Sequence, residues 1–361
     1  MKKKKVICAM SGGVDSSVSA AILNKKGYNV TGVFMKCWQA ELANSPAKLG
    51  WDTKPCSAEE DEMWARRAAA KIGIPFYSVD LVGEYKDRVF DYFIAEYKAG
   101  RTPNPDVMCN REIKFGVFYD WAINEFGADY IATGHYARLR QGSLFKGKDP
   151  NKDQSYFLWA VPREKFEKVL FPVGNFLKSE VRAMANKFGL PNAARADSQG
   201  VCFVGEFPMG FFLQNYIADR PGLVINAKGE NIGEHRGLHF YTIGQRRGIN
   251  IGGGLPYYVA RKDFANNALV VSREYDDELF REKITASSAN WISPSIVFHR
   301  PFKCKAKLRY RQQDQDAIIE REDNSENLFI KFIQPQRAVT PGQSIVFYRG
   351  DALLGGAIID G

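Results

Sequence analysis

Ser11-Gly12-Gly13-Val14-Asp15-Ser16-Ser17 separates two segments of different periodicity. Residues 6–10 form an apolar run with strand character, and residues 18–23 alternate in a way that predicts an amphipathic helix. Two adjacent glycines allow the backbone to approach an anion closely, and N–H groups at the start of a helix attract negative charge. The segment therefore predicts a strand, a polyphosphate-binding loop and a helix, with an ordinary glycine-rich turn as the alternative.

Asp15 distinguishes this loop from the common nucleoside-triphosphate motif, which carries a lysine that reaches the terminal phosphates. A carboxylate beside phosphates is chemically reasonable when Mg²⁺ bridges the two, because the metal neutralises their repulsion. We therefore expect the loop to act together with Mg²⁺.

The chain has 361 residues, enough for two or three domains, and its 45% hydrophobic and 25% charged residues are ordinary for a globular protein. We find no apolar stretch long enough to span a bilayer. The apolar run that follows Lys2 to Lys5 is too short for the core of a signal peptide. These features predict a cytoplasmic protein without a membrane partner.

The six cysteines lack C-x-x-C spacing, and the four histidines do not cluster beside them, so we expect no zinc site. In a reducing compartment each cysteine is then a small buried hydrophobe or a reactive thiol. The net charge of +9 favours a polyanionic partner such as nucleic acid, although basic solvated surfaces are common.

Strand-like apolar runs alternate with helix-period segments in the first part of the chain. Strands are expected at residues 6–10, 30–35, 76–81 and 130–133, and helices at residues 18–26, 59–72, 85–98 and 113–126. This alternation predicts an α/β fold built on a doubly wound, mostly parallel sheet, with ligands at the carboxyl ends of the strands. Residues 11–17 and Gly134-His135 both follow such ends.

The residue pattern changes after about residue 208, where glycine and proline residues separate short runs of β-branched residues. We expect a catalytic domain at residues 1–208, a small β-rich central domain at residues 209–284 and a C-terminal β-barrel at residues 285–361. Turn signals in the last segment stand at Asp323-Asn324 and at Pro341-Gly342.

Cys109 lies in a segment, residues 102–110, that two prolines stiffen, just ahead of the helix predicted over residues 113–126. Arg111 and Lys114 are close in sequence, and a helix N-terminus together with cations lowers the pKa of a thiol. The pattern predicts a reactive thiolate, and a buried inert cysteine is the alternative.

Cys202 lies in a second polar segment, residues 197–204, where Gly200 permits a tight bend. Alone, this segment is weak support for a site. Two cysteines in separate polar segments become informative if a reaction needs one sulfur to attack and another to carry a group.

Cationic residues occupy every odd position from Lys303 to Arg311, and apolar or aromatic residues occupy every even one. As a strand, this segment would align five charges on one face over roughly 26 Å, a track suited to a phosphate backbone. An edge strand that its lysines protect from aggregation is the alternative.

The chain resembles the bacterial tRNA-specific 2-thiouridylases, a family of the ATP pyrophosphatase superfamily, which an S-G-G-x-D-S loop marks. The resemblance runs essentially from end to end. The stretches that carry it are residues 9–17, Asn104-Pro105-Asp106, Met108-Cys109-Asn110, and residues 132–136, 152–156, 200–203, 309–312 and 341–343.

The resemblance implies that ATP adenylates the oxygen at position 2 of the wobble uridine of a tRNA, with release of pyrophosphate, and that sulfur then displaces AMP. Cys202 would accept a persulfide from an upstream sulfur-donor protein. Cys109 would attack the activated base, or would free the sulfur through a transient disulfide with Cys202. Thiolate chemistry agrees with either role for Cys109, because a mixed disulfide is regenerated by exchange.

The resemblance also implies binding roles, which carry over by position. ATP would be bound by Ala9, Met10, Ser11, Gly12, Gly13, Val14, Asp15, Ser16, Met35 and Gly134. Asn104, Pro105 and Asp106 would contact the target base, and His135 would touch the substrate unless it is a loop histidine without a ligand. The tRNA would be held by Lys152, Asp153, Gln154, Arg309, Tyr310 and Gln343.

Two other function classes remain open on the sequence. Enzymes of the same superfamily join amines to adenylated carboxylates, a reaction that needs no paired thiols. A noncatalytic RNA-binding protein could use ATP only as a regulator, and pyrophosphate release that depends on tRNA would exclude it.

Overall fold

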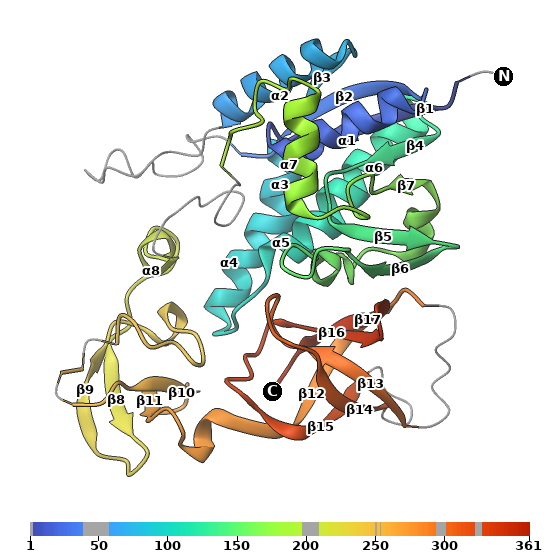
Figure 1. The fold of residues 1–361 in the computed structure, drawn as a ribbon. Helices are drawn as coiled ribbons and strands as arrows, with labels where there is room; N and C mark the ends of the chain where they lie inside the picture. The colour runs from blue at the N-terminus through green and yellow to red at the C-terminus, as the bar shows by residue number, and fades with distance from the viewer. Residues whose placement is uncertain are drawn as a thin grey trace.

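The computed structural model of the protein describes residues 3–38, 58–196, 209–249, 251–252, 254–293, 301–321 and 327–361. Within these residues, a parallel sheet of five strands runs in the order β3-β2-β1-β4-β7 (Figure 1). Its strands are β1 (Lys5–Ala9), β2 (Asn29–Lys36), β3 (Phe76–Asp80), β4 (Tyr130–Ala132) and β7 (Val169–Leu170). The predicted parallel α/β sheet is confirmed. Strand β7 escapes sequence prediction because two residues are too few for a periodic signal.

Helices connect these strands. The α-helices of the described residues are α1 (Val14–Lys25), α2 (Ala58–Ile72), α3 (Val82–Tyr85), α4 (Asp91–Lys98), α5 (Pro105–Met108), α6 (Phe118–Asp120), α7 (Lys178–Lys187) and α8 (Met209–Leu213). Wider π-helical turns extend them at Lys86–Phe90, Cys109–Val117 and Trp121–Glu125, and short 3₁₀ helices lie at Ser155–Leu158, Arg163–Lys168, Leu238–Phe240 and Asp277–Leu279.

Alternate residues of β1 enter two different cores, because successive side chains of a strand point to opposite faces. Val6 and Cys8 pack in one cluster with residues of α1 and α2. Ile7 and Ala9 pack in another with residues of α4 and of the segment Cys109–Val117. Both faces of the sheet are therefore covered, as expected for a doubly wound fold.

Helix α1 differs from the amphipathic helix that its sequence predicts. Its residues 16–23 are all buried, since the helix lies against the sheet on one side and contacts α2 and α7 on others. The buried serines are accommodated by hydrogen bonds: Ser17 Oγ donates to the Gly13 carbonyl at 3.0 Å, and Ser19 Oγ donates to the Thr133 carbonyl at 3.4 Å. Small residues with satisfied hydroxyls thus allow the helix that follows the loop to be buried all round.

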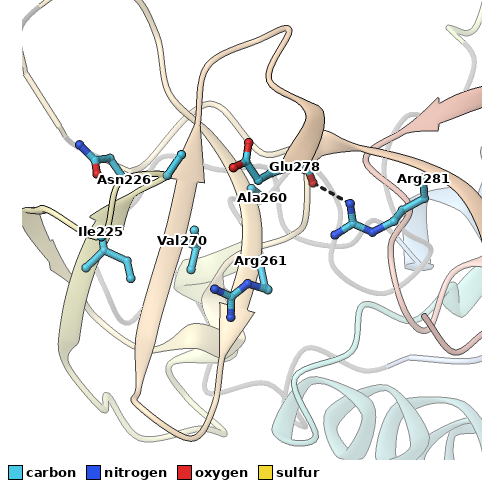
Figure 2. Close-up of a pocket in the computed structure, with 9 residues that line it drawn as sticks. Ile225, Asn226, Ala260, Arg261, Val270, Glu278 and Arg281 are labelled. Carbon is cyan, nitrogen blue, oxygen red and sulfur yellow. Dashed lines mark hydrogen bonds between the residues drawn. The ribbon is translucent and has the colours of Figure 1, made fainter.

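A second sheet lies after α8 and has the strand order β10-β11-β8-β9 among the described residues. Its strands are β8 (Gly222–Asn226), β9 (Asn231–His235), β10 (Tyr258–Asp263) and β11 (Ala268–Ser272). A pocket of about 160 Å³ opens on this sheet, and Asn226, Arg261, Glu278 and Arg281 belong to its lining (Figure 2). None of the predicted site residues is among the described residues that line it, so the candidate site lies elsewhere.

The C-terminal strands form a closed barrel, since β12 pairs with both β15 and β17. The barrel strands are β12 (Phe280–Trp291), β13 (Phe302–Lys307), β14 (Gln315–Arg321), β15 (Leu328–Arg337), β16 (Ser344–Arg349) and β17 (Ala352–Ile359). The predicted turn at Pro341-Gly342 is confirmed, and the turn predicted at Asp323-Asn324 lies outside the described residues. Strands β5 (Ala137–Arg140) and β6 (Ser143–Lys146) extend the barrel sheet beside β17, so the sequence following β4 is joined to the barrel.

None of the helices in the described part of the chain combines the length and the hydrophobicity that crossing a membrane requires.

Candidate functional site

The loop at residues 11–13 connects the carboxyl end of β1 with the start of α1. Gly12 has a φ of +79°, and a Cβ atom there would lie 2.3 Å from the Asp61 carbonyl oxygen of α2. The position therefore needs glycine for both its backbone conformation and its close approach to another helix. The strand order reverses beside β1, which lies between β2 and β4, and open α/β sheets bind ligands at such a point.

Hydrogen bonds within the loop hold its backbone in a single shape. Ser16 Oγ accepts a hydrogen bond from the Ser11 N–H at 3.2 Å and donates one to the Gly13 carbonyl at 3.2 Å. From outside the loop, Asn192 Nδ2 donates to the Gly12 carbonyl at 2.8 Å and to Ser17 Oγ at 2.9 Å. None of these bonds uses the N–H groups of residues 14–16 at the start of α1, which are the groups that attract an anion at a helix N-terminus.

Gly134 brings the loop after β4 against the same helix start. A Cβ atom at Gly134 would lie 2.7 Å from the Ser16 nitrogen and 3.0 Å from the Asp15 carbonyl carbon. The structure therefore brings Gly134 and residues 11–16 together, as the sequence predicts for one nucleotide pocket.

Three further predicted ATP residues lie on or beside the same strands. Ala9 and Met10 are buried, and the Met10 N–H donates to the Val33 carbonyl at 2.8 Å. Met35, near the end of β2, is partly buried against the core on the face opposite Met10. Their assignment to ATP stays a prediction.

Lys178 is a site residue that sequence reasoning misses. Its ammonium, at the start of α7, donates to both oxygens of Asp15 at 2.7 and 2.8 Å, and Tyr136 Oη donates to Asp15 Oδ1 at 2.8 Å. The cation that is missing from the loop thus comes from a helix more than 160 positions further along the chain. No local sequence motif indicates that Lys178 belongs to the site, because its contact with Asp15 exists only after α7 has packed against α1.

Cys109 lies inside a continuous helical segment and not, as predicted, in a loop ahead of a helix. Asn104 caps α5, its Oδ1 accepting the Val107 N–H at 3.2 Å, and Pro105 occupies the first turn, where its missing N–H costs nothing. The helical path continues from Met108 directly into Cys109–Val117, with a kink at Gly116. The predicted helix over residues 113–126 therefore begins earlier than its apolar periodicity indicates.

Cys109 is 3% exposed, and the surroundings of its thiol contradict the prediction of an acidic thiol. Burial raises the pKa of the Cys109 thiol to about 12, and the nearby Lys114 cation opposes this shift only weakly. The effect of desolvation on this pKa exceeds that of the Lys114 charge, because Cys109 belongs to the main hydrophobic core. In this state the sulfur is protonated at neutral pH.

We expect Cys109 to react with iodoacetamide at pH 8 on the order of a thousandfold more slowly than a free cysteine with a pKa of about 8.5. Its rate is expected to rise about tenfold per pH unit between pH 7 and 9, because the thiolate fraction grows in that proportion while the pKa stays far above. Peptide mass spectrometry after timed alkylation measures this rate, with urea-unfolded protein as control. A plateau in the rate below pH 9 would contradict the raised pKa.

His135 is buried and close to Lys114, and burial lowers its pKa well below the ordinary value of histidine. Its Nδ1 lies 2.7 Å from the Thr133 hydroxyl, and Phe115 and Phe171 pack around the ring. The histidine is thus neutral at pH 7, and it is available to a substrate as a polar contact and not as a cation. Its contact with substrate stays a prediction.

Cys202 and the segment at residues 197–204 lie outside the described residues. The implied Cys109–Cys202 disulfide therefore stays a prediction.

Several residues predicted to hold the tRNA also make contacts within the chain. Asp153 accepts the N–H groups of Gly147 at 2.9 Å and Ser155 at 3.0 Å. The side chain of Gln154 accepts the Tyr136 N–H at 3.0 Å. These contacts organise the turn that carries the partly exposed Lys152.

Arg309 donates to the Ala338 carbonyl at 2.8 Å, and Tyr310 packs on Phe157 with ring centroids 4.5 Å apart. The amide of Gln343 donates to the carbonyls of Thr102 and Pro103 at 2.8 and 3.1 Å, ahead of α5. The structure therefore places Gln343 beside the start of the Cys109 segment. The tRNA assignments stay predictions.

Only part of the basic segment at residues 303–311 forms the strand that its alternating pattern predicts. Strand β13 ends at Lys307, and Arg309 and Arg311 lie in the turn that follows. Lys305 pairs with Asp316 at 2.8 Å and Lys307 lies 3.6 Å from Asp314, so carboxylates of β14 and its approach offset part of the charge. The prediction of five aligned charges is wrong, because β13 ends at Lys307 and Arg309 and Arg311 lie beyond the strand.

Comparisons with known proteins cover the whole chain. Family models match residues 4–206, described as a tRNA methyl transferase HUP domain, residues 210–273, described as a tRNA methyl transferase PRC-barrel domain, and residues 281–359, described as an aminomethyltransferase beta-barrel domain. Among solved structures, a 4-thiouridine synthetase bound to RNA and ATP aligns with a TM-score of 0.34 at 19% identity, over 55% of this chain and 44% of that chain. So weak a structural likeness supports no functional statement.

Two relatives are similar along their whole length. The protein named tRNA-specific 2-thiouridylase MnmA 1 from Geobacillus kaustophilus is 49% identical over 368 residues, which cover 100% of this chain and 96% of that protein. The tRNA-specific 2-thiouridylase MnmA of Pseudomonas aeruginosa is 48% identical over 369 residues, covering 99% and 95%. With this identity and the glycine loop, Asp15 and Cys109 placed as described, the chain belongs to the family of tRNA-specific 2-thiouridylases.

Proposed function

We propose that this protein is an ATP-dependent sulfurtransferase that converts the wobble uridine of tRNA into 2-thiouridine. The observation that carries the proposal is its similarity, over essentially the full chain, to proteins named for that activity. In the proposed reaction the uridine O2 attacks the α-phosphorus of ATP and pyrophosphate leaves. Sulfur then forms a bond to C2, and AMP leaves with the former O2.

The phosphate loop supports the first step. N–H groups at the start of α1 would hold the phosphates, and Lys178 would supply positive charge beside Asp15. Mg²⁺ fits this site, because Mg²⁺ in proteins is commonly bound by one or two carboxylates together with phosphates and water, and Asp15 offers one carboxylate. When bound, the metal would neutralise the polyphosphate charge. Asp15 would then share its oxygens between the metal and Lys178.

The second step needs two thiols. We propose that Cys202 carries the persulfide from a sulfur-donor protein and that Cys109 closes the cycle. After the terminal persulfide sulfur has bonded to C2, the Cys109 thiolate attacks the Cys202 sulfur, the thiocarbonyl leaves with the electron pair, and a Cys109–Cys202 disulfide remains. A thiol reductant supplies the two electrons that restore both cysteines. Because burial raises the pKa of Cys109 to about 12, this attack requires substrate to change the surroundings of the sulfur.

One incubation tests the proposal. The protein is mixed with ATP, Mg²⁺, a protein persulfide as sulfur donor, a thiol reductant and unmodified tRNA, and nucleosides are then separated and identified by mass spectrometry. Replacement of one uridine oxygen by sulfur, with pyrophosphate released only when tRNA is present, is the expected result. Pyrophosphate release without tRNA and with a carboxylate substrate would instead identify an amide-forming synthetase, and no pyrophosphate under any condition would identify a noncatalytic RNA-binding protein.

The tRNA substrate also supports a cytoplasmic location, which we propose together with the domain division at residues 208 and 284. The proposed tRNA contacts are Lys152, Asp153, Gln154, Arg309, Tyr310 and Gln343.

Lys303 of β13 is exposed, and Lys305 of the same strand is partly exposed. Reversing either one to glutamate is expected to weaken tRNA binding and to lower the slope of log K against log salt by about 0.7 to 0.9, since one fewer counterion is released per lost phosphate contact. Filter binding across a salt series measures the slope. Lys86→Glu, which reverses a partly exposed charge on the parallel-sheet unit, is the matched control. An unchanged slope in both β13 variants would remove this strand from the tRNA interface.

A further inference from the structure

Residues 100–103 connect α4 with the capped start of α5, and both C-terminal sheets contact this short connection. In Figure 1 the far end of α4 points toward both of these sheets. Helix α4 ends with Gly100 at a φ of +78°, and the N–H groups of Gly100 and Arg101 bond back to the carbonyls of Tyr97 and Glu96 at 2.9 Å each. This termination satisfies the last carbonyls of the helix and turns the Gly100 carbonyl outward, where another part of the chain can use it.

The central sheet supplies the partner of that carbonyl. Lys262, near the end of β10, donates from Nζ to the Gly100 carbonyl at 2.8 Å. Two residues later, the ring of Phe264 covers Gly100 so closely that a Cβ atom there would lie 1.9 Å from the ring tip. Burial lowers the pKa of Lys262 to about 8, so its ammonium has exchanged water for this contact.

The barrel holds Thr102 and Pro103 of the same connection. The Thr102 N–H donates to the Pro341 carbonyl at 2.9 Å, and Gln343 Nε2 donates to the carbonyls of Thr102 and Pro103. Gly342 must be glycine here, since its φ is +88° and a Cβ atom would lie 2.9 Å from the Thr102 nitrogen. Gly100, Thr102 and Pro103 are therefore all held through their backbone groups by two other units.

The helical segment of Cys109 comes directly after the connection. Asn104 caps α5, and α5 runs without interruption into Cys109–Val117. A displacement of residues 100–103 would move the start of this helix and, with it, the thiol.

We propose that Lys262 and Phe264 form a latch on Gly100, and that this latch positions the Cys109 helix for sulfur transfer when the central and barrel units engage tRNA. The inference deepens the proposed function and rests on it for the reaction. Lys262 is a positioning residue here: it acts on the reacting sulfur through the Gly100 carbonyl and α5, and it does not touch the substrate.

Lys262→Met tests the latch, because methionine keeps the apolar stem and removes the charged donor. We expect kcat for thiolation to fall about tenfold with KM and Kd for tRNA unchanged within twofold, no decrease in Tm, and at least fivefold faster alkylation of Cys109. Arg261→Met is the matched control on the same strand, since the exposed Arg261 pairs with Asp263 and its replacement is expected to leave all of these quantities unchanged.

A second pair of variants tests the contact from the other side. Gly100→Ala is expected to lower kcat by more than tenfold, because the new methyl group would occupy the position of the Phe264 ring. Adding Phe264→Ala opens that space, and the double variant is expected to recover at least part of the lost kcat relative to Gly100→Ala alone.

An unchanged kcat in Lys262→Met overturns the latch. So does a loss of tRNA affinity as large as the loss of kcat, which would make Lys262 a tRNA contact, or a lower Tm with uniform inactivation, which would make it a structural residue. Failure of the wild-type protein to thiolate tRNA would refute the proposed function alone, because faster alkylation of Cys109 in Lys262→Met is measured without the reaction and would still support the latch.

Discussion

Cys109→Ser is expected to reduce thiolation of tRNA at least a thousandfold, which is about 4 kcal/mol of transition-state stabilisation, while pyrophosphate release that depends on ATP and tRNA persists. The physical reason is that a serine hydroxyl cannot form the proposed disulfide that would free sulfur from Cys202. In the proposed reaction, the adenylation step relies on the glycine loop and does not use this sulfur. The two steps are therefore expected to separate in one variant.

Parallel assays of 2-thiouridine by mass spectrometry and of pyrophosphate by a coupled assay measure this separation. Cys304→Ser is the matched control, because Cys304 is also buried, burial also raises its pKa to about 12, and it lies in the barrel strand β13. Thiolation by Cys109→Ser within tenfold of the wild-type rate would refute the role of Cys109 and favour an enzyme class without paired thiols.

Gly134→Ala is expected to lower pyrophosphate release at least a hundredfold, about 3 kcal/mol, without unfolding the protein. The added methyl group would lie 2.7 Å from the Ser16 nitrogen and 3.0 Å from the Asp15 carbonyl carbon, which are backbone atoms of the helix start and cannot rotate away. The start of α1 must therefore shift, and N–H groups aimed at phosphates lose most of their effect when they move by even a fraction of an ångström.

Gly83→Ala provides the control, because a Cβ atom at Gly83 meets nothing within 4 Å. Calorimetric binding of a non-hydrolysable ATP analogue and the rate of pyrophosphate release are the measurements. If Gly134→Ala binds the analogue and releases pyrophosphate as the wild type does, the nucleotide pocket does not lie at this contact.

The parallel sheet and its glycine loop are predictable from the sequence because their signals are local. An apolar run followed by two glycines and a helix-forming segment needs no distant residue to be recognised, and the expected strands at residues 6–10 and 76–81 appear as β1 and β3. The attachment of β5 and β6 to the barrel is not predictable in this way, since it pairs Phe145 with Ala352 across more than 200 positions.

In the candidate site, too, some features are recognisable from local sequence and others depend on the folded chain. Cys109 is recognisable from its motif, but its pKa depends on how many apolar side chains surround it, and neighbouring cations in the sequence mislead on that point. The prediction for the basic strand is wrong for a similar reason. Alternation in the sequence shows which side chains share a face of a strand. The end of strand pairing at Lys307 and the ion pair of Lys305 with Asp316 depend on the assembled sheet.

By itself, then, the order of residues determined the α/β architecture, the glycine loop and the choice of Cys109 and Cys202 as candidate sulfur-transfer residues, because each depends on side-chain periodicity or on a motif within a few positions. Only the folded chain decided that Lys178 faces Asp15, that Cys109 is a protonated buried thiol, and that Lys262 and Gln343 hold the connection ahead of its helix. Those properties follow from desolvation and from contacts between residues far apart in sequence, which exist only once the sheets and helices have packed together.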